Sequence, residues 1–439
     1  MYEAFSAKFV RNIDANRTIK DELTAAIRTQ GARRRISVTD LVNPRQAFFR
    51  RTRPDIQPSA ERAQTMMTGT GVHAQFERTI STEEFAEQFV TYEDIVGKID
   101  IYEDAPVELK TTSFQDRDGV VRPSYLDQLG MYCAMTGIPR GHLVVYYTPR
   151  SGDGAVLSAY AVELSNLAEI RTGMIRRRDL FQRALDAGTP SGLPQCEWYG
   201  RRCDYQDVCG CEAAPPLERV VRADMATVTR DPGLEDQINE KLRRSGARPT
   251  GYRIHHLLFP RKTAYRQQPD AVVEEDESSE ARLKEIRRRG FYEALTKALQ
   301  YGFPGGFRSI PVGLRTLADR VSMFRGVPTL VRTTGFRRMI DRDRLPQEMS
   351  WNVDRLAFIC ALAESAQGRL ILYYNAIPDD KFMVYEIGFK DLPTIRAEVE
   401  RRVALLESGA APDKLPPCPA WMYETCEFAP HCGCGGVPA

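Results

Sequence analysis

Ten cysteines constrain this chain more than any other feature, because they fall into two matching sets. One set lies in PQCEWYGRRCDYQDVCGCE and the other in PPCPAWMYETCEFAPHCGCGG, and each set ends in the pattern C-x5-C-x-C. The quartets are Cys196, Cys203, Cys209 and Cys211, and Cys418, Cys426, Cys432 and Cys434. The remaining two cysteines, Cys133 and Cys360, also correspond, since each lies in an apolar helical pattern typical of buried helix residues.

Further matches extend this repeat along the chain. RISVTDLVNPRQAFFR (35–50) matches YRIHHLLFPRKTAYR (252–266), DAPVELKTTSF (104–114) matches GVPTLVRTTGF (326–336), and GHLVVYYTP (141–149) matches GRLILYYNA (368–376). The pattern indicates a tandem duplication of a unit of about 200 residues. We expect one domain over residues 1–212, a linker over 213–235 and a second domain over 236–439, which suits a length of 439 residues.

Each copy alternates helical and strand patterns. In the first copy, helices are predicted over 38–51, 68–80, 124–137 and 166–187, and strands over 96–104, 107–112, 142–148 and 156–164. This alternation predicts an α/β fold in which a mixed central sheet is flanked by helices.

Composition narrows the class of protein. With 42% hydrophobic and 27% charged residues, the chain differs from disordered and fibrous proteins. No signal-peptide pattern or membrane-span pattern is present, so we expect a cytoplasmic protein with no membrane partner. The net charge of +2 neither requires nor excludes a polyanionic partner. Arginine clusters such as 33–35 and 176–178 are consistent with nucleic-acid contact or with solvated helix faces.

One group of residues in the first copy could carry chemistry. Asp100 ends the strand-like segment VGKID, and Glu108 and Lys110 alternate on the next strand, so they project from one face. Two carboxylates can hold Mg²⁺ or Mn²⁺ at a phosphodiester, while an adjacent ammonium stabilises developing negative charge. A solvent-facing strand can produce the same pattern by chance, so this spacing alone does not decide the matter.

Residues on two predicted helices extend the candidate site. His73 precedes the Asp100 strand and could add an imidazole ligand, although a surface or capping role is the simpler interpretation. Gln128 and Tyr132 are four residues apart on the helix that follows, so both face one side and could reach a substrate or Lys110. The thiol quartets suit iron–sulfur clusters or zinc, with disulfides as the remaining interpretation.

The order of these residues resembles the PD-(D/E)XK nuclease superfamily, in particular its RecB-like branch, which includes the iron–sulfur Cas-four exonucleases of CRISPR adaptation and AddB-type helicase–nuclease subunits. The resemblance covers most of residues 35–212 and implies tandem restriction-endonuclease-like domains. Its motifs read here as Gly69 to His73, Asp100, Glu108-Leu109-Lys110 and Gln128 to Tyr132. The resemblance implies that His73, Asp100, Glu108 and the Leu109 carbonyl bind the metal. It also implies that Lys110 assists catalysis and that Gln128 and Tyr132 order the site.

The cysteines depart from that family pattern. Such enzymes commonly supply one cluster cysteine from before the nuclease motifs, but Asn43 occupies that place here and Phe259 occupies it in the second copy. Both copies carry a compact downstream quartet instead. The resemblance favours two 4Fe-4S clusters, one in each domain, while the altered spacing keeps zinc open as the alternative.

The second copy lacks the candidate ligands. Alignment of the two copies, segment by segment, places Ser322 at the Asp100 position, Leu330 at the Glu108 position and Tyr292 at the His73 position. The counterparts of Lys110, Gln128 and Tyr132 are Arg332, Arg355 and Ile359. Because a leucine cannot bind a hard cation, we expect one active copy and one degenerate copy.

The sequence therefore predicts a DNA nuclease that depends on Mg²⁺ or Mn²⁺, with exonuclease action on single-stranded or frayed ends. The alternative is a non-catalytic DNA-binding scaffold or accessory subunit. The partners that the resemblance implies are DNA and a helicase, a recombinase or a CRISPR-adaptation protein. The pathway, the polarity and the oligomeric state stay open.

Overall fold

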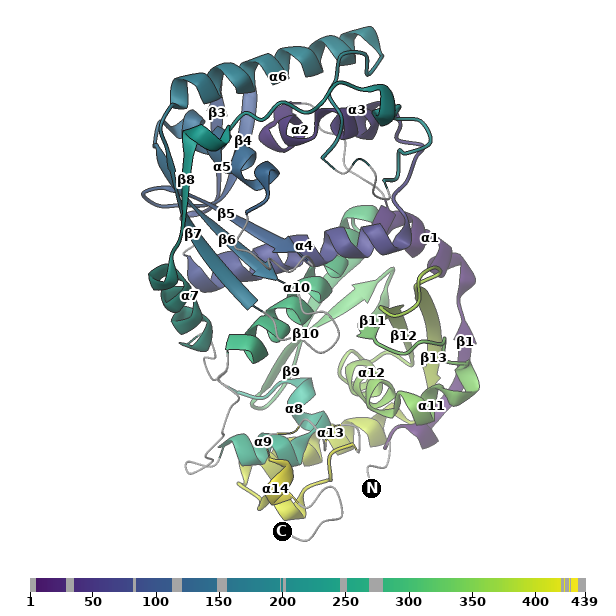
Figure 1. Cartoon of the computed structure of the whole chain (residues 1–439). Helices are drawn as coiled ribbons and strands as arrows, with labels where there is room; N and C mark the ends of the chain where they lie inside the picture. The colour runs from purple at the N-terminus through teal and green to yellow at the C-terminus, as the bar shows by residue number, and fades with distance from the viewer. Residues whose placement is uncertain are drawn as a thin grey trace. The chain divides into compact units, whose positions relative to one another are not determined.

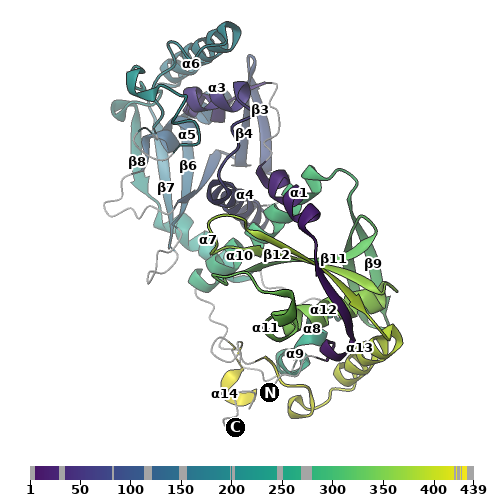
Figure 2. The ribbon, with the colours of Figure 1, turned by 90° about the vertical axis from the view of Figure 1, so that its right-hand side faces the viewer.

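The protein is a mixed α/β structure with two mixed sheets flanked by helices, which confirms the predicted class (Figures 1 and 2). The computed structural model describes residues 5–28, 35–81, 84–112, 121–147, 156–197, 199, 203–244, 251–267, 279–419, 422, 426 and 428–432. No helix within these ranges combines the length and the apolar character needed to cross a membrane.

Two compact units make up the chain. The first unit consists of Arg28–Gly246 and Ser278–Ala294, and the second consists of Met1–Ile27, Ala247–Glu277 and Leu295–Ala439. This division differs from the predicted boundaries at 212 and 236, because both the N-terminal segment and part of one helix belong to the unit that is distant in sequence.

The sheet of the first unit has the strand order β2-β4-β5-β6-β7-β8, with β3 paired to β4. Its strands are β2 (Ile36–Ser37), β3 (Ala86–Tyr92), β4 (Ile95–Tyr102), β5 (Pro106–Thr112), β6 (Arg140–Tyr147), β7 (Val156–Leu164) and β8 (Ala226–Arg230). The β2–β4 and β5–β6 pairs are parallel and the others are antiparallel. Its helices are α2 (Val38–Val42), α3 (Pro44–Thr52), α4 (Ala60–Ile80), α5 (Pro123–Thr136), α6 (Leu167–Ala187), α7 (Pro232–Arg244) and the first part of α10 (Ser279–Gly302), with 3-10 helices η2 (Cys211–Ala213) and η3 (Ala223–Met225).

Both faces of this sheet are covered, as strand β6 illustrates. Leu143 and Val145 pack into a core formed with α2, α3, α5 and α6, whereas Val144 and Tyr146 pack into a core formed with α4, α7 and α10. Figures 1 and 2 show α4 and α7 together against one face. An apolar run in a strand buried on both sides is the expected sequence signature of such a sheet.

The predicted elements of the first unit are present, but some have different bounds and further elements occur that were not predicted. The helix expected over 38–51 is two helices, because Asn43 leaves helical geometry with φ −134° and Pro44 begins α3. Helix α4 begins at Ala60 rather than 68, where the Ser59 side chain accepts a hydrogen bond from the Arg62 amide. Strand β3 was not predicted. Gly137 ends α5 as expected, with a left-handed φ of 79°.

The sheet of the second unit has the order β1-β13-β12-β11-β10-β9, in which only the β11–β12 pair is parallel. Its strands are β1 (Val10–Ala15), β9 (Phe307–Leu314), β10 (Leu317–Phe324), β11 (Val327–Thr334), β12 (Gln367–Tyr374) and β13 (Phe382–Phe389). Its helices are α1 (Arg17–Arg28, whose last residue lies in the first unit), α8 (Ile254–Leu258), α9 (Pro260–Gln267), the end of α10, α11 (Leu345–Glu348), α12 (Ser350–Leu362), α13 (Leu392–Glu407) and α14 (Ala429–Cys432), with 3-10 helices η1 (Ala7–Phe9), η4 (Arg342–Arg344) and η5 (Pro412–Lys414).

An added edge strand explains why the units are not contiguous in sequence. Strand β1, near the N-terminus, pairs with β13 of the second unit, while β8 pairs with β7 of the first unit (Figure 1). In each unit a buried aspartate binds the segment that leads into the edge strand. Asp354 accepts the Ser6 amide at 2.8 Å before β1, and Asp127 accepts the Val220 amide at 2.9 Å before β8. The segment 213–235, which was expected to be a linker, therefore supplies a strand to the first sheet.

Candidate functional site

The candidate site lies where strands β4 and β5 separate. These strands pair only at Ile101 with Val107 and at Tyr102 with Pro106, and they diverge beyond these pairs. Asp100 sits at this fork, and its Oδ2 accepts the Leu109 amide at 2.7 Å. The carboxylate thus takes the place of a strand partner, which fixes Asp100 beside the strand that carries Glu108 and Lys110.

A chain of hydrogen bonds continues from β5 to α5. The Lys110 ammonium donates to Glu108 and, at 2.9 Å, to Oε1 of Gln128. The Gln128 side-chain amide then donates to the Tyr132 hydroxyl at 3.2 Å. The i, i+4 spacing predicted for Gln128 and Tyr132 is therefore used, since both side chains meet in one network.

His73 joins this network from α4, because its Nδ1 lies 3.8 Å from Oδ2 of Asp100. The six predicted catalytic side chains thus form two sets, which are joined through the Leu109 amide that Asp100 accepts. Leu109 buries its side chain in the core against α4, so only its main chain faces the polar group. The backbone of α4 is also closely packed here: a Cβ on Gly71 would lie 2.0 Å from the Gly290 carbonyl oxygen of α10, whereas a Cβ on Gly69 would meet no described atom of another element within 4 Å.

Burial sets the protonation chemistry of this group. Burial raises the pKa of Glu108 to about 7, although the Lys110 charge acts in the opposite direction. Burial opposes ionisation of Asp100 as well, but hydrogen bonding and attraction to His73 outweigh it and lower the pKa of Asp100. In turn, Asp100 outweighs the effect of burial on His73 and raises its pKa. Glu108 does the same for Lys110.

Two acidic residues near the site were not predicted from the sequence. Glu77 is 6% exposed and follows His73 by one helical turn, and burial, reinforced by Asp100, raises its pKa to about 7. Glu87 of β3 has a left-handed φ of 53°, which is unusual for a non-glycine residue inside a strand. The spacing from His73 to Glu77 on one helix face was a sequence signal for the first of these.

The donor set suits a hard divalent cation in its chemistry. Two carboxylates and an imidazole are ligands that Mg²⁺ and Mn²⁺ accept. Oε2 of Glu108 is buried and has no hydrogen-bond partner among the described residues, so a cation there would satisfy a polar atom that is otherwise costly to bury. Within those same ranges, no three His, Cys, Asp or Glu side chains are grouped closely enough to hold a metal ion.

The second unit has the same fork without the carboxylates. Strands β10 and β11 also pair at only two positions, and Leu330 stands beside Leu370 of β12 as Glu108 stands beside Leu143 of β6. Leu330 is 4% exposed and belongs to the apolar core of the second unit. Ser322 lies on β10 and the Ile359 side chain is buried. The counterparts of the candidate ligands are therefore core or neutral residues.

The first cysteine quartet forms a buried thiol-rich segment. Cys196, Cys209 and Cys211 are buried and Cys203 is half-buried. Burial raises the pKa of the Cys196 thiol, and the neighbouring thiols of Cys211 and Cys203 raise it further. All nine cysteines in the described part of the chain are free, so none of them forms a disulfide.

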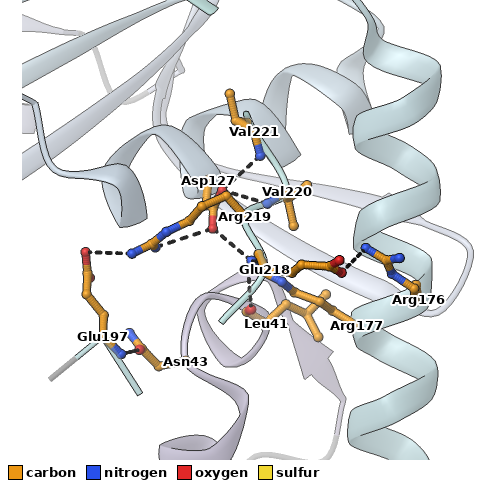
Figure 3. A network of polar contacts seen from close by, with 10 residues as sticks. All are labelled: Leu41, Asn43, Asp127, Arg176, Arg177, Glu197, Glu218, Arg219, Val220 and Val221. Carbon is orange, nitrogen blue, oxygen red and sulfur yellow. Dashed lines mark hydrogen bonds and ion pairs between the residues drawn. The ribbon is translucent and has the colours of Figure 1, made fainter. Parts of the chain in front are cut away.

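The residue at the place of the missing upstream cysteine contacts the quartet segment in both units. The side-chain oxygen of Asn43 accepts the Glu197 amide at 3.2 Å, directly after Cys196 (Figure 3). In the second unit, Phe259 packs against Cys418 and Met422.

A charged network secures the chain that leaves the first quartet (Figure 3). Asp127 on α5 is fully buried and accepts Arg177 at 3.0 Å and the amides of Val220 and Val221 at 2.9 Å. Arg219 lies 3.7 Å from the same carboxylate and 3.5 Å from Glu197. The network joins α5 and α6 to Glu197, directly after the first cysteine, and to residues 218–221, which follow the last cysteine.

In the second quartet, Cys418 is buried and Cys426 and Cys432 are half-buried, while Cys434 lies outside the described residues. Cys133 and Cys360 are fully buried in the two cores and lie apart from the quartets in sequence, as predicted.

Comparison with known proteins adds little. No family model and no curated protein matches the sequence. Among solved structures, a chain described as the crystal structure of SSO0001 is 16% identical, and the alignment covers 44% of this chain and 97% of that chain. The TM-score is 0.31, so this likeness carries no argument about fold or function.

Proposed function

We propose that the protein is a metal-dependent deoxyribonuclease of the RecB-like PD-(D/E)XK type, with one active unit and one degenerate unit. The observation that carries this proposal is the connected, largely buried group of His73, Asp100, Glu108 and Lys110, in which one Glu108 oxygen has no partner within the described chain. Buried titratable groups with perturbed pKa values are typical of functional sites. In a purely structural role, an unsatisfied carboxylate would only lower stability.

The residues have separate roles in this proposal. His73, Asp100 and Glu108, with the Leu109 carbonyl, would hold Mg²⁺ or Mn²⁺, and the bound ion would neutralise phosphodiester charge and lower the pKa of its water. Lys110 places an ammonium next to the reacting phosphate and stabilises negative charge that develops there. Gln128 holds that ammonium, and Tyr132 orients Gln128 in turn.

An exposed aromatic residue supports a single-stranded substrate. Phe89 on β3 is 72% exposed and stands opposite Lys98, two residues before Asp100 on β4. An exposed ring beside a cation offers a base a stacking surface, and unpaired bases are free to stack. Exonucleolytic action on single-stranded or frayed DNA ends is the form of the reaction that we propose.

Each cysteine quartet is proposed to bind one 4Fe-4S cluster, with zinc as the alternative. The thiols that the structure describes, four in the first quartet and three in the second, are free and buried or half-buried, and thiols are suitable donors for either group. Anaerobic purification with iron, sulfide and zinc analysis distinguishes the two. A Cys209→Ser variant that keeps its full metal content and thermal stability would remove this part of the proposal.

A scaffold role is proposed for the second unit alone, because Leu330 replaces the key carboxylate and packs into the core. DNA docking or the docking of a helicase, recombinase or CRISPR-adaptation protein would use its surface rather than its fork. Such a unit needs its fold but not its ligands.

The test compares the wild-type protein with Glu108→Gln on labelled single-stranded and double-stranded DNA, in Mn²⁺ and in EDTA. We expect cleavage by the wild type in Mn²⁺ alone, and a loss of about 10²–10³-fold in the variant with DNA binding retained. Equal cleavage by both proteins, or cleavage by neither, would contradict the nuclease proposal. DNA binding without cleavage would instead favour the scaffold for the whole chain.

A further inference from the structure

One buried arginine holds the first cysteine segment at four points. Arg45, the second residue of α3, is 5% exposed. Its guanidinium donates to the carbonyl oxygens of Leu193 and Cys209 at 2.6 Å each, and to those of Pro190 and Pro194 at 3.2 and 3.3 Å. These acceptors lie before the first cysteine of the quartet and at the third, so one side chain joins both ends of the segment.

The second unit repeats this contact with matching atoms. Arg261, the second residue of α9, donates from Nη1 to the Cys432 carbonyl at 3.0 Å and from Nη2 to the Leu415 carbonyl at 2.7 Å. Nη1 of Arg45 reaches the third cysteine of its quartet, and its Nη2 reaches the matching leucine, Leu193. Both arginines follow a proline that begins a helix, so the start of each helix presents the guanidinium group in the same direction.

This contact is the same in the two units although their forks differ. The second unit has a leucine where the first has Glu108, yet the arginine contact to the cysteine segment persists. The arginine is therefore tied to the quartets and not to the acidic site.

The buried charge of Arg45 also indicates a link to the cysteines. No carboxylate in the described residues forms an ion pair with Arg45, and the acceptors of its hydrogen bonds named above are neutral carbonyls. A buried cation is costly unless negative charge compensates it. Thiolates in the adjacent segment would supply that charge, because a quartet bound to zinc or to a cluster is ionised.

We propose that Arg45 and Arg261 are positioning residues that dock the cysteine segments onto their units before any metal binds. Hydrogen bonds to carbonyls do not depend on metal, so the segment stays in place in the metal-free protein and its thiols are held near one another. Only the last step, metal capture by the docked thiols, rests on the proposed function.

The experiment measures docking through the rate at which each cysteine is alkylated in the full-length, metal-free, reduced protein, with mass spectrometry to resolve the sites. In Arg45→Met we expect alkylation of Cys196, Cys203 and Cys209 to rise about 10- to 100-fold, as loss of hydrogen bonds to a charged group implies. The cysteines of the second quartet should keep their wild-type rates. Arg261→Met should give the reverse pattern.

Two internal controls separate undocking from unfolding. Cys133 and Cys360 lie in the cores of the first and second units, so their alkylation reports loss of each core. Arg45→Lys keeps the charge but cannot span several carbonyls, so it should also undock the segment. Unchanged rates at the first quartet in Arg45→Met would overturn the proposal. Rates that rise at Cys133 as much as at the quartet, in both Arg45 variants, would overturn it too.

Metal capture gives a second readout. Zn²⁺ titration of the reduced protein should show an affinity about 10- to 100-fold weaker in Arg45→Met, as is typical when residues that orient metal ligands are removed. Arg45→Lys should lose less, because its charge still compensates thiolates. If the wild-type quartets bind neither zinc nor iron, the cofactor proposal fails while the alkylation pattern still decides the docking role.

Discussion

The parallel strand pair at the centre of each sheet shows how the two units differ. In the first unit Glu108 stands beside Leu143, and in the second Leu330 stands beside Leu370, at matching register positions. The first pair buries a carboxylate with an unpartnered oxygen in the described chain, and the second buries only apolar side chains. The fork of the sheet therefore does not require the Glu108 carboxylate, because the second unit forms it with a leucine at that position.

Other contacts are shared by both units and concern the position of helices. Arg177 on α6 donates to the Leu41 carbonyl at 3.1 Å, and Arg402 on α13 donates to the matching Leu257 carbonyl at 2.7 Å. The acidic partners differ, since Arg177 pairs with Asp127 on another helix and Arg402 pairs with Glu398 on its own helix. Contacts that hold the fold persist in both copies, while the residues for which we propose a chemical role occur in one.

Substitution at the fork tests this comparison most directly. Asp100→Ala should reduce DNA cleavage by about 10³-fold, since it removes a half-buried carboxylate from the proposed cation site. The matched variant Ser322→Ala should leave turnover unchanged. Single-turnover cleavage with Mn²⁺ measures both. If the two variants lose the same activity, the division into one active and one degenerate copy is wrong.

The buried aspartate network should matter more to stability than its counterpart. Asp127→Ala leaves Arg177 buried without its carboxylate and should lower the free energy of unfolding by about 3–5 kcal/mol. Glu398→Ala should lower it by about 2–3 kcal/mol, because fewer contacts are lost around Arg402. Denaturant unfolding followed by circular dichroism gives both values. A larger loss in Glu398→Ala would reverse this ranking.

The matched glycines Gly141 and Gly368 test how α5 packs against β6 and how α12 packs against β12. A Cβ on Gly368 would lie 2.5 Å from the Cys360 sulfur, and one on Gly141 would lie 3.0 Å from the Cys133 sulfur. Both alanine variants should lose about 1–3 kcal/mol by overpacking, with the larger loss at Gly368. The double variant Gly368→Ala, Cys360→Ala should recover part of that loss, as measured by thermal unfolding. An additive result would show that the two residues do not interact.

Aromatic exposure near the first fork should affect substrate binding. Phe89→Ala should raise the KM for single-stranded DNA about tenfold, the effect of one lost base-stacking contact. Tyr301 of the second unit is 64% exposed and provides the control, for which no change is expected. Steady-state cleavage assays on single strands distinguish these outcomes. Equal effects of the two substitutions would show that the DNA strand does not stack on Phe89.

The smallest predicted effect concerns how the stability of the fold depends on pH. Burial of Glu398 favours its neutral form, but hydrogen bonds from Arg401 and Arg402 outweigh this and lower its pKa below the ordinary 4.5. Because the folded-state pKa is the lower one, this stabilisation is present above about pH 4.5 and disappears as the pH falls through the folded value. Solvent screening limits it to under about 1 kcal/mol. Glu398→Gln should therefore flatten this part of the stability profile, and an unchanged acid slope would contradict the assignment.

Several features could be predicted from the sequence because they depend on local spacing. The Asp100, Glu108 and Lys110 pattern, and the pairing of Gln128 with Tyr132, follow from strand and helix periodicity, and the structure brings these residues together. Strand β3 and Glu77 were missed. The alternation of β3 is obscured because Phe89 is exposed while Val90 and Tyr92 pack on the core. Glu77 looks like an ordinary exposed helix residue until its burial is known.

The sequence by itself determined the duplication, the mixed α/β class and the choice of residues at the first fork, because periodicity and repeated motifs are written in residue order. Only the tertiary structure decided which unit each edge strand joins, since β1 and β8 are short segments whose partners are selected by backbone hydrogen bonds to distant strands. It also decided the contacts of Arg45, whose acceptors are carbonyls of residues about 150 positions away. Main-chain acceptors carry no sequence signature, so such contacts emerge only when the chain is folded.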